Sequence, residues 1–344
     1  MKALYLHELN HVELIDVPKP TIKNPTDVLI KVTTTTICGS DIHIIEGLIP
    51  TKPGFVLGHE YVGVIEEVGS EVKDFKVGDR VIGPPVPYCG VCPRCEKKDY
   101  AHCMNSGIHG SGVTMGDIPG VHAEYTRVPH ADVCLKKVPD DLSDEQVIFI
   151  ADIASTGYTG VSHGKLAEGE TLVIFGCGPV GMSALLTAKL HNPGKIIVVE
   201  KSPDRLQKAM ELGATHAVTA DNTVLDKIAE YTDGQGADVV IDAVGLPITM
   251  EQGLACLGIY GRMHMVGIPG KPVTIPPEYF YKNISFSMGL GDLSNIGYLF
   301  DKVKQNQLDL TPMITQTLPL DEIMEGLDMA KNRQDVTMKV LIKP

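Results

Sequence analysis

The first half of the chain contains short hydrophobic runs in which apolar and polar positions alternate or β-branched residues cluster. Residues 27–32 and 61–68 are two of these runs, and turns rich in Gly and Pro separate them. Alternation with a period of two is typical of strands that turn one face to a core and the other to solvent. We therefore expect an antiparallel β domain over residues 1–153.

The pattern changes near residue 154 to fully apolar runs that alternate with helical segments. The runs 171–175, 196–199 and 238–242 predict buried strands, and residues 180–190 and 203–212 predict helices between them. This alternation is typical of a doubly wound parallel sheet, so we predict an α/β domain of the Rossmann type over residues 154–288.

The last part of the chain carries two amphipathic stretches, 296–304 and 320–331, and then the strand-like run 339–342. We expect residues 289–344 to be a return segment that folds back and completes the first domain. The chain shows no repeat of fixed period and no low-complexity segment, which argues against a solenoid or a disordered tail.

Composition and charge narrow the choice of partners. A chain of 344 residues exceeds the size at which one core stops growing, and 43% hydrophobic with 21% charged residues is typical of globular proteins. The net charge of −13, without a basic stripe, argues against nucleic acid as a partner. No apolar run approaches the roughly 18 to 20 residues that span a bilayer, and no signal peptide is evident, so we expect a cytoplasmic protein that does not enter a membrane.

A glycine-rich turn follows the apolar run 171–175 and opens the next helix. Gly176 permits the tight turn, Gly178 lets backbone amides approach a pyrophosphate, and Gly181 lets the helix lie close to the strand. A purely steric glycine turn is the alternative interpretation. Because a strand precedes the turn and a helix follows it, we predict a dinucleotide site.

Glu200 ends the next apolar run, where the fold needs an acidic side chain to accept hydrogen bonds from the adenosine ribose. Its charge favours NAD, because it would repel a 2′-phosphate by about 1 to 4 kcal/mol at about 4 Å. Lys201 and Arg205 lie nearby and could offset this repulsion, so NADP stays an alternative. Arg205 can equally be interpreted as part of a solvated helix face.

Four of the eight cysteines fall within fifteen residues and form what we call the cysteine lobe: Cys89, Cys92, Cys95 and Cys103. In the reducing cytosol such cysteines are metal ligands or buried thiols rather than disulfides. Four thiolates saturate a tetrahedral Zn²⁺ and leave no position for substrate, so we predict a closed structural zinc site. An iron–sulfur cluster and four unligated thiols are the alternatives.

A second set of metal-binding residue types is spread along the chain, and we call it the mixed group. It consists of Cys38, the adjacent pair His59 and Glu60, and Asp152. Each of these residues alone has an ordinary structural explanation. Their spacing along the chain does not show that they form one site.

The run Gly58-His59-Glu60, two residues, Gly63, five residues, Gly69, two residues, Val72 resembles the signature of the zinc-containing alcohol dehydrogenases at each fixed position. The cysteine lobe and the Gly176 turn follow in that family's order, so the resemblance covers essentially the whole chain. It implies a GroES-like β catalytic domain with a Rossmann domain, two zinc ions per chain, NAD and a homotetramer. The family includes threonine and polyol dehydrogenases.

The resemblance also implies residue roles. Cys38, His59 and Asp152 are expected to hold the catalytic zinc, with Glu60 as an alternating ligand or a neighbour of the ligands. Many animal and plant relatives have Cys at the position of Asp152. An Asp at this position resembles the tetrameric bacterial secondary-alcohol dehydrogenases. Those bacterial enzymes often lack the cysteine lobe that this chain retains, so the resemblance to that subgroup is incomplete.

For proton transfer, the resemblance places Ser40 beside the substrate hydroxyl and His43 at the far end of a relay through the cofactor ribose. In most proteins residues like these would be an ordinary turn residue and a surface histidine. By the same resemblance, further cofactor contacts are expected at the start of the helix after the glycine turn and after the later strands, where plain strand-end packing is the alternative: Val180, Val244, Val266, Gly267, Ile268 and Leu290.

The predicted activity is hydride transfer between a secondary or primary alcohol and NAD, which yields a ketone or an aldehyde. An NAD-dependent threonine dehydrogenase, or a polyol dehydrogenase of the sorbitol or butanediol type, is the main alternative. A non-catalytic family member is a third. The presence of all four residues of the mixed group argues against it.

Overall fold

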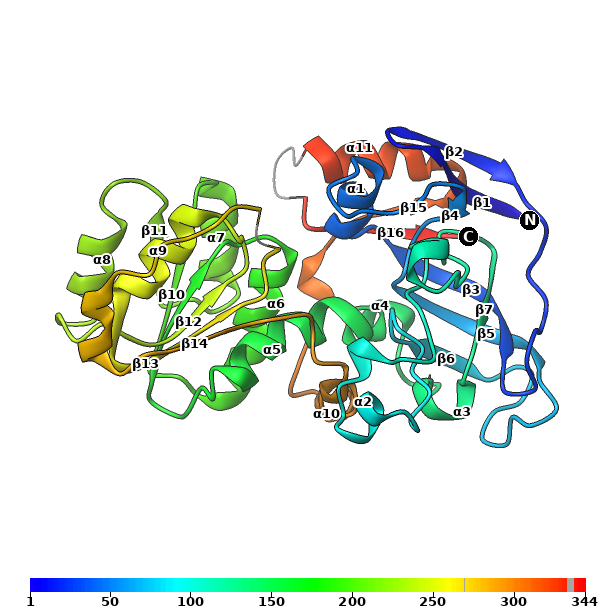
Figure 1. Cartoon of the computed structure of the whole chain (residues 1–344), viewed down its shortest axis with the longest axis horizontal. Coiled ribbons are helices and arrows are strands. Elements are labelled where there is room, and N and C mark those ends of the chain that lie inside the picture. Colours follow the sequence, from blue (N-terminus) through cyan, green and yellow to red (C-terminus); the bar gives the residue numbers. More distant parts are fainter. Residues whose placement is uncertain (269, 333–336) are drawn as a thin grey trace. The chain divides into compact units, whose positions relative to one another are not determined.

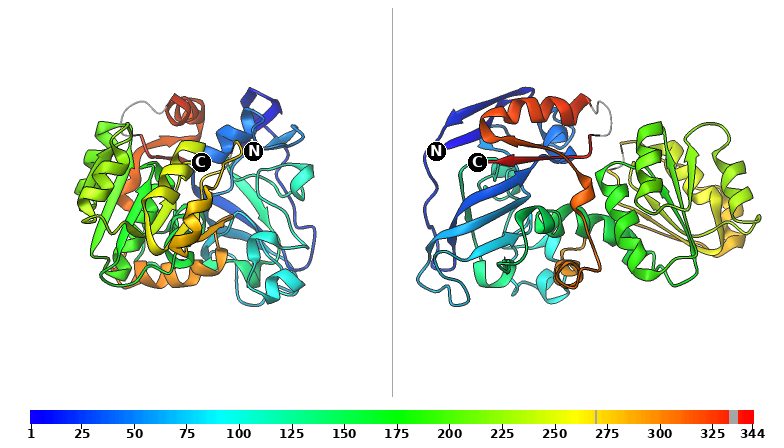
Figure 2. Two further views of the ribbon diagram at one scale, coloured as in Figure 1. Left: turned by 60° about the vertical axis from the view of Figure 1, so that its left-hand side comes forward. Right: turned by 180° about the vertical axis from the view of Figure 1, so that it is seen from behind.

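A computed structural model describes residues 1–268, 270–332 and 337–344. The chain forms two compact units, one of Met1–Asp152 with Met313–Pro344 and one of Ile153–Pro312 (Figure 1). Both chain ends lie in the first unit (Figure 2). Residues 289–312, which we expected in the return segment, lie in the second unit, and the chain resumes the first unit at Met313.

The first unit contains two sheets whose pairings are antiparallel except between β15 and β16. The larger sheet has the order β15-β16-β3-β5-β6-β8, and β7 also pairs with β3; the smaller has the order β2-β1-β4. The strands are β1 (Lys2–Glu8), β2 (His11–Asp16), β3 (Val28–Thr36), β4 (Phe55–Val56), β5 (Tyr61–Val68), β6 (Arg80–Gly83), β7 (Tyr125–Val128), β8 (Lys136–Lys137), β15 (Ile314–Pro319) and β16 (Lys339–Lys343).

Helices of the first unit pack around these sheets. They are α1 (Gly39–Ile45), α2 (Pro93–Glu96), α3 (Ala131–Cys134), α4 (Asp144–Val147) and α11 (Ile323–Asn332). A core cluster joins apolar residues of β1, α1, α11 and β16, so the end of the chain shares a core with its beginning. Strand β16 pairs with β3, with Leu341 opposite Thr36.

The second unit is built on six parallel strands in the order β11-β10-β9-β12-β13-β14. Counted along the chain this is the order 3-2-1-4-5-6 of a doubly wound sheet, which confirms the predicted fold class. The elements are α5 (Ser155–His163), β9 (Thr171–Phe175), α6 (Pro179–Ala188), β10 (Lys195–Glu200), α7 (Pro203–Glu211), β11 (His216–Thr219), α8 (Val224–Tyr231), β12 (Ala237–Asp242), α9 (Pro247–Cys256), β13 (Leu257–Met265), β14 (Ser285–Met288) and α10 (Ile296–Lys304).

Helices cover this sheet on both faces, as its uniformly apolar strands require. Val173 and Phe175 of β9 pack in one cluster with residues of α8 and α9. On the other face, α5 approaches β12 closely: a Cβ added to Gly160 would lie 2.8 Å from the Ile241 side chain. Among the described residues, no helix is long and apolar enough to cross a membrane.

Candidate metal and dinucleotide sites

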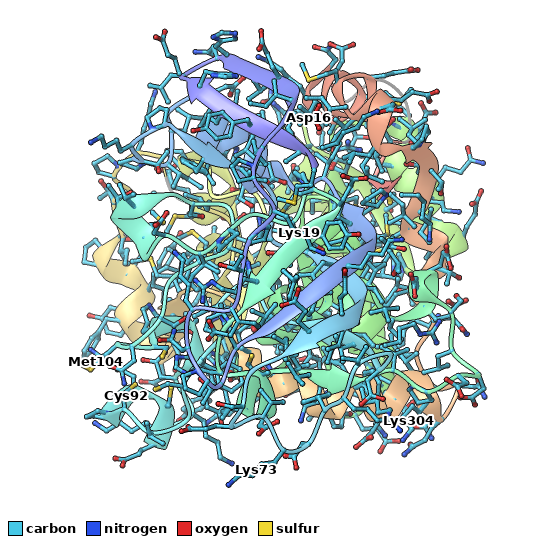
Figure 3. The ribbon with its side chains drawn as sticks, turned by 90° about the vertical axis from the view of Figure 1, so that its right-hand side faces the viewer. Asp16, Lys19, Lys73, Cys92, Met104 and Lys304 are labelled. Atoms are coloured by element: carbon cyan, nitrogen blue, oxygen red, sulfur yellow. The ribbon has the colours of Figure 1, made fainter. Side chains whose placement is uncertain are left out.

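The cysteine lobe wraps its four sulfurs inward, and all four cysteines are buried. Its chain turns supply N–H donors to the sulfurs. The Cys89 amide lies 3.3 Å from Cys103 Sγ, and the Met104 amide lies 3.5 Å from Cys92 Sγ. Figure 3 labels Cys92 and Met104. Amides of Met104 and Cys95 lower the pKa of Cys92 to about 6, which favours the thiolate that a metal ion needs.

The spacing of the sulfurs fits one metal ion. One ligand atom from each cysteine lies within 4.8 Å of the others, and Cys89 Sγ and Cys95 Sγ are 4.0 Å apart. Zinc–sulfur bonds of about 2.3 Å in a tetrahedron place sulfurs about 3.8 Å apart. An iron–sulfur cluster would hold its cysteine sulfurs farther apart, because the cluster lies between them. The geometry therefore favours a single, fully ligated ion.

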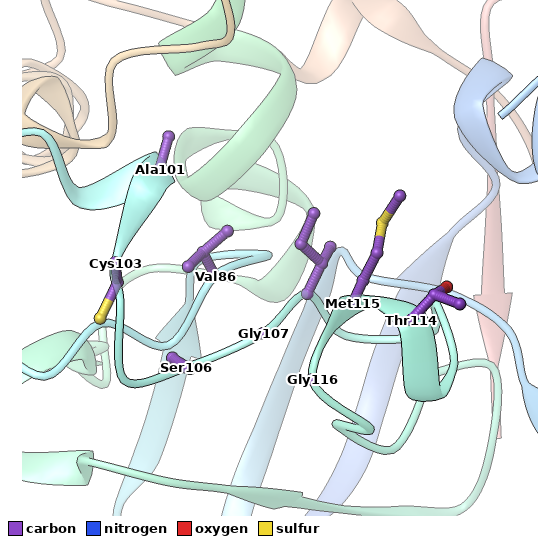
Figure 4. A pocket seen from close by; sticks show the side chains of 9 residues that line it. Val86, Ala101, Cys103, Ser106, Gly107, Thr114, Met115 and Gly116 are labelled. Atoms are coloured by element: carbon purple, nitrogen blue, oxygen red, sulfur yellow. The ribbon is translucent and has the colours of Figure 1, made fainter. Parts of the chain in front are cut away.

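A cavity of about 280 Å³ borders the cysteine lobe (Figure 4). Val86, Ile108 and Met115 contribute to its wall, and Cys103 lies at its edge. Among the residues that the structure describes, no charged side chain lines it. Cys103 already belongs to the lobe, and the described residues of the cavity wall bring no further cysteine, histidine or carboxylate to it.

The structure also brings the mixed group together. One ligand atom each from Cys38, His59, Glu60 and Asp152 lies within 4.8 Å of the others. The first three residues meet because β3 and β5 are antiparallel neighbours with Thr35 opposite Tyr61, so Cys38 leaves the sheet where His59 and Glu60 enter it. Asp152 lies in a π-helical turn, Ile150–Ala154, a local widening that is frequent at functional sites.

His59 lies between two carboxylates. Its Nδ1 is 3.2 Å from Asp41 Oδ1, and its Nε2 is 3.3 Å from Asp152 Oδ2. Burial favours the neutral imidazole, but Asp41 and Asp152 outweigh this effect and raise the pKa of His59 well above its usual value. The raised pKa means that both ring nitrogens of His59 hold a proton. A metal ion bound at Nε2 would take the place of the Nε2 proton, while Asp41 fixes the ring through Nδ1.

Asp41 is a site residue that the sequence did not reveal. It is fully buried, and its Oδ2 accepts a hydrogen bond from the Cys38 amide and lies 3.2 Å from His122 Nε2. Burial opposes its ionisation, but the neighbouring imidazoles of His59 and His122 hold the pKa of Asp41 well below its usual range. The signal in the sequence is an acidic residue in the first turn of α1, directly after Cys38.

Lys339 is the second residue that the sequence did not reveal. It is 1% exposed, and its Nζ lies 2.5 Å from Glu60 Oε1 and 3.2 Å from the Ile37 carbonyl oxygen. Glu60 Oε2 is buried and has no hydrogen-bond partner among the described residues. Burial raises the pKa of Glu60 to about 7, against the opposing effect of Lys339. An unpartnered carboxylate oxygen beside a thiolate, an imidazole and a second carboxylate is a donor set that fits zinc.

The two expected relay residues lie on α1. Ser40 Oγ is 3.2 Å from His59 Nε2, which brings this hydroxyl to the mixed group. His43 follows one helical turn later and is half-buried, and its carbonyl oxygen accepts hydrogen bonds from the amides of Leu48 and Ile49.

The glycine turn of the second unit lies between β9 and α6. Gly176 has a φ of +91°, and α6 begins at Pro179 directly after Gly178. A Cβ on Gly181 would lie 1.7 Å from the Gly176 carbonyl oxygen, whereas a Cβ on Gly178 would point into open space. The turn therefore leaves room for a ligand in front of the helix N-terminus, which attracts phosphate.

The carboxylate of Glu200 braces this turn from the end of β10. Its Oε2 accepts a hydrogen bond from the Cys177 amide at 2.8 Å, and its Oε1 accepts one from the Lys201 amide at 2.7 Å. Arg205 on α7 is only 8% exposed, so the alternative interpretation of a solvated helix face is wrong. The Lys201 side chain is exposed.

The other expected cofactor contacts follow neighbouring strands. Val244 comes after β12, residues 266–268 come after β13, and Leu290 comes after β14, while Val180 lies in the first turn of α6. The carboxyl ends of parallel strands share one edge of a sheet, which is where doubly wound folds bind ligands. Ile268 and Leu290 are 53% and 56% exposed there.

Comparison with known proteins agrees with this architecture. The sequence model of the alcohol dehydrogenase GroES-like domain matches residues 24–140, and that of the zinc-binding dehydrogenases matches residues 179–295. An alcohol dehydrogenase of Cupriavidus necator is 34% identical, over all of this chain and 99% of the relative. Among solved structures, the alcohol dehydrogenase TADH from Thermus sp. ATN1 has a TM-score of 0.95 at 34% identity, over 100% of this chain and 99% of that one.

Other relatives differ in substrate or cofactor. Sorbitol dehydrogenase of Bacillus subtilis is 31% identical, over 100% of this chain and 97% of its own. The structure of 2R,3R-butanediol dehydrogenase from Bacillus subtilis has a TM-score of 0.87 at 29% identity, over 100% and 99% of the two chains. Solved relatives at 26% identity bind NADH in one case, from E. coli CFT073 (TM-score 0.91), and NADP in another, from Sinorhizobium meliloti 1021 (TM-score 0.87); each match covers 100% of this chain and 99% of the other.

Fold and sites thus define a zinc-binding dehydrogenase with a GroES-like domain and a Rossmann domain. The chain belongs to the medium-chain, zinc-dependent alcohol dehydrogenase family. It is an oxidoreductase that uses zinc and a nicotinamide cofactor and acts on small-molecule alcohols or carbonyl compounds.

Proposed function

We propose that the protein oxidises a secondary or primary alcohol to the ketone or aldehyde with NAD, and that it catalyses the reverse reduction. The observation that carries this proposal is the contrast in donor sets, four sulfurs in one group and mixed donors in the other. In the mixed group, Cys38, His59 and Asp152 supply three zinc ligands. Glu60, whose Oε1 is held by Lys339, is an alternating ligand, so the fourth position is left for substrate oxygen.

Each residue of the site has a defined task in this proposal. The zinc supplies a Lewis acid that favours the alkoxide form of the alcohol, and the nicotinamide supplies the hydride acceptor. Ser40 accepts the alcohol proton, because a hydroxyl can accept and donate at once, and it lies 3.2 Å from His59 Nε2. Ser40 gives up its own proton at the same time. His43, one helical turn away, receives that proton by way of the ribose hydroxyl when the cofactor is bound and releases it to solvent, because imidazole titrates near neutral pH.

The choice of NAD rests on Glu200 at the end of β10. Its carboxylate accepts hydrogen bonds from the amides of Cys177 and Lys201, which supports a fixed position beside the glycine turn. From there we expect its charge to repel a 2′-phosphate. Arg205 is buried on the adjacent helix and favours the opposite choice. Comparison of kcat/KM for NAD and NADP tests the assignment. We expect NAD to be preferred, and equal values would contradict the role of Glu200.

A polyol or threonine substrate is the second candidate, and relatives named sorbitol and butanediol dehydrogenase favour the polyol. NADH production from 2-propanol, 2,3-butanediol, sorbitol and threonine separates these possibilities. We expect turnover of at least one of the first three. If protein shown to contain zinc turned over none of the four substrates, that result would support a non-catalytic family member.

We further propose a homotetramer in the cytoplasm. Strand β14 lies at the edge of its sheet, and large apolar side chains are exposed around it, including Tyr260, Phe280, Tyr281 and Met288. Exposed edges and apolar patches of this kind favour association. Metal-binding thiols stay reduced in the cytoplasm. Light scattering should give four times the chain mass of 37.1 kDa, and a monomer would contradict the proposal.

A further inference from the structure

Residues 289–292 of the second unit follow β14 and are tied to helix α5 by polar contacts. The Asp292 amide donates a hydrogen bond to Thr159 Oγ1 at 2.7 Å, and the Asp292 carboxylate lies 3.5 Å from His163 Nε2. Asp292 Oδ1 also accepts a hydrogen bond from the Ser294 amide at 2.9 Å. One end of this short loop is therefore fixed by α5.

The contacts come from a single face of α5. Thr156, Thr159 and His163 are spaced by three and four residues, which places them on one side of a helix. Thr159 Oγ1 also donates a hydrogen bond to the Ser155 carbonyl at 2.7 Å, so its hydroxyl both donates and accepts. Gly291 lies so close that an added Cβ would be 2.4 Å from Thr156 Oγ1. This face of α5 is shaped to receive the loop.

The other end of the loop is fixed by β13. The Gly289 amide donates a hydrogen bond to the Met265 carbonyl oxygen at 3.3 Å. One residue pair earlier, His264 Nδ1 lies 2.8 Å from Ser287 Oγ. The buried His264 ring also contacts the His163 ring edge to face, with centroids 4.9 Å apart. His163 therefore links the two anchors.

Between these anchors the loop exposes an apolar side chain. Leu290 is 56% exposed at the carboxyl edge of the sheet, and Ile268 at the end of β13 is 53% exposed at the same edge. A large apolar side chain that stays in solvent adds little to the stability of the fold, even though both ends of its loop are anchored. Such an arrangement is expected where a rigid scaffold presents a side chain to a ligand.

We propose that Thr159 and His163 are positioning residues that hold Leu290 against the nicotinamide half of the bound cofactor. The proposal rests on the NAD-linked function proposed above. Neither side chain needs to touch the cofactor. Both act through residues 289–292, so they should affect the nicotinamide half of the ligand and leave the adenosine half unchanged.

The test compares NADH with ADP-ribose, which lacks the nicotinamide, by calorimetry on the full-length, zinc-containing protein. Thr159→Val keeps the shape but removes the acceptor for the Asp292 amide. The matched control is Thr187→Val on α6, because the buried Thr187 hydroxyl makes the same bond to the carbonyl four residues earlier, at 2.7 Å. His163→Gln, at a half-exposed side chain, is a second variant that does not threaten folding.

Thr159→Val should weaken NADH binding by about tenfold and His163→Gln by about threefold, the scale of one lost hydrogen bond. ADP-ribose binding should change by less than about twofold in both variants, and Thr187→Val should change neither ligand. Unchanged NADH binding in both variants, or an equal loss for NADH and ADP-ribose, would overturn the inference. Failure of the wild-type protein to bind either ligand would instead overturn the proposed NAD-linked function.

Discussion

The two metal-binding groups of the first unit are built in opposite ways. The cysteine lobe takes four identical donors from fifteen consecutive residues, and all four are buried. The mixed group takes three kinds of donor from three distant segments, and buried partners, Asp41 and Lys339, contact its members. We propose that the uniform, saturated set of the lobe only holds its ion, whereas the mixed set, with Glu60 as an alternating ligand, leaves a ligand position beside the Ser40 hydroxyl for chemistry.

The charges around the two groups differ as well. With Zn²⁺ bound and all three acidic groups ionised, Cys38, Glu60 and Asp152 would carry three negative charges, one more than Zn²⁺ neutralises. Lys339 supplies the remaining positive charge in a buried position. The lobe offsets its thiolates with backbone N–H groups instead. The mixed group thus depends on a second ionised side chain, while the lobe depends on the course of its own chain.

The largest expected effect comes from Cys38→Ser, which removes a thiolate from the mixed group. Turnover should fall by more than about a hundredfold, because loss of a residue that only neighbours the metal ligands already costs about 10- to 100-fold and Cys38 is itself a proposed ligand. Calorimetric binding of NADH and the unfolding temperature should change little, because the glycine turn belongs to the other unit. Cys256→Ser, at a buried cysteine of the second unit, is the control for loss of a thiol. Simultaneous loss of turnover and NADH binding would count against this division.

Lys339→Met should have the next largest effect, because it leaves the buried Glu60 carboxylate without its cation. We expect turnover to fall by about 10- to 100-fold and the zinc content to change. The free energy of unfolding should drop by about 3 to 5 kcal/mol, as when one partner of a buried ion pair is removed. Lys339→Arg keeps the charge and should recover part of both. Wild-type zinc content and turnover in Lys339→Met would refute this role.

Cys95→Ser should act on stability rather than on chemistry. A structural zinc site contributes folding free energy, so the unfolding temperature should fall by roughly 5 °C or more. Turnover per folded molecule should stay within about twofold of wild type. The control is Cys134→Ser, a buried cysteine outside the lobe. Normal thermal stability with selective loss of activity would reverse the assignments of the two groups.

The smallest expected effect is the loss of stability at low pH that His109 causes. His109 is buried, packs its ring against Tyr61 beside the mixed group, and donates from Nδ1 to the Pro119 carbonyl. Burial lowers the pKa of His109 to about 4, whereas an unfolded histidine titrates near 6.5. The unfolded chain therefore binds more protons between these values. Stability should fall by about 1 kcal/mol per pH unit as pH drops from about 6.5 to 4.

Urea unfolding at pH 7, 6 and 5 measures this slope, and His109→Gln should flatten it. An equal slope in the variant would assign the acid sensitivity to other groups.

Predictability from sequence follows the same contrast. The cysteine lobe is local, so spacing alone proposed its ligand set. The mixed group was proposed only through the family resemblance, because no local rule joins residues 38, 59 and 152. Lys339 was missed for the same reason: β16 reaches Glu60 through strand pairing across the whole chain. Asp41 sits in the very run that contains Cys38, and only the fold reveals its contact with His59.

For the fold, the hydrophobic periods predicted the strands, because burial on one or both faces leaves a direct pattern. They did not predict where the chain leaves the second unit. Helix α10 has the expected amphipathic pattern, but this pattern does not show which of the two units its apolar face packs against. In the structure Tyr298 of α10 stacks on Tyr158 of α5, with ring centroids 5.2 Å apart. The helix therefore stays with the second unit.

The most direct test of the contrast between the two groups is the visible spectrum of the cobalt-substituted protein while imidazole, a small metal ligand, is added. An open site should bind imidazole and change its spectrum, whereas a saturated Cys₄ site should not. We predict a spectral change in the wild-type protein and in Cys134→Ser, and none in Cys38→Ser. A change that persists in Cys38→Ser, or its absence from the wild-type protein, would contradict the account.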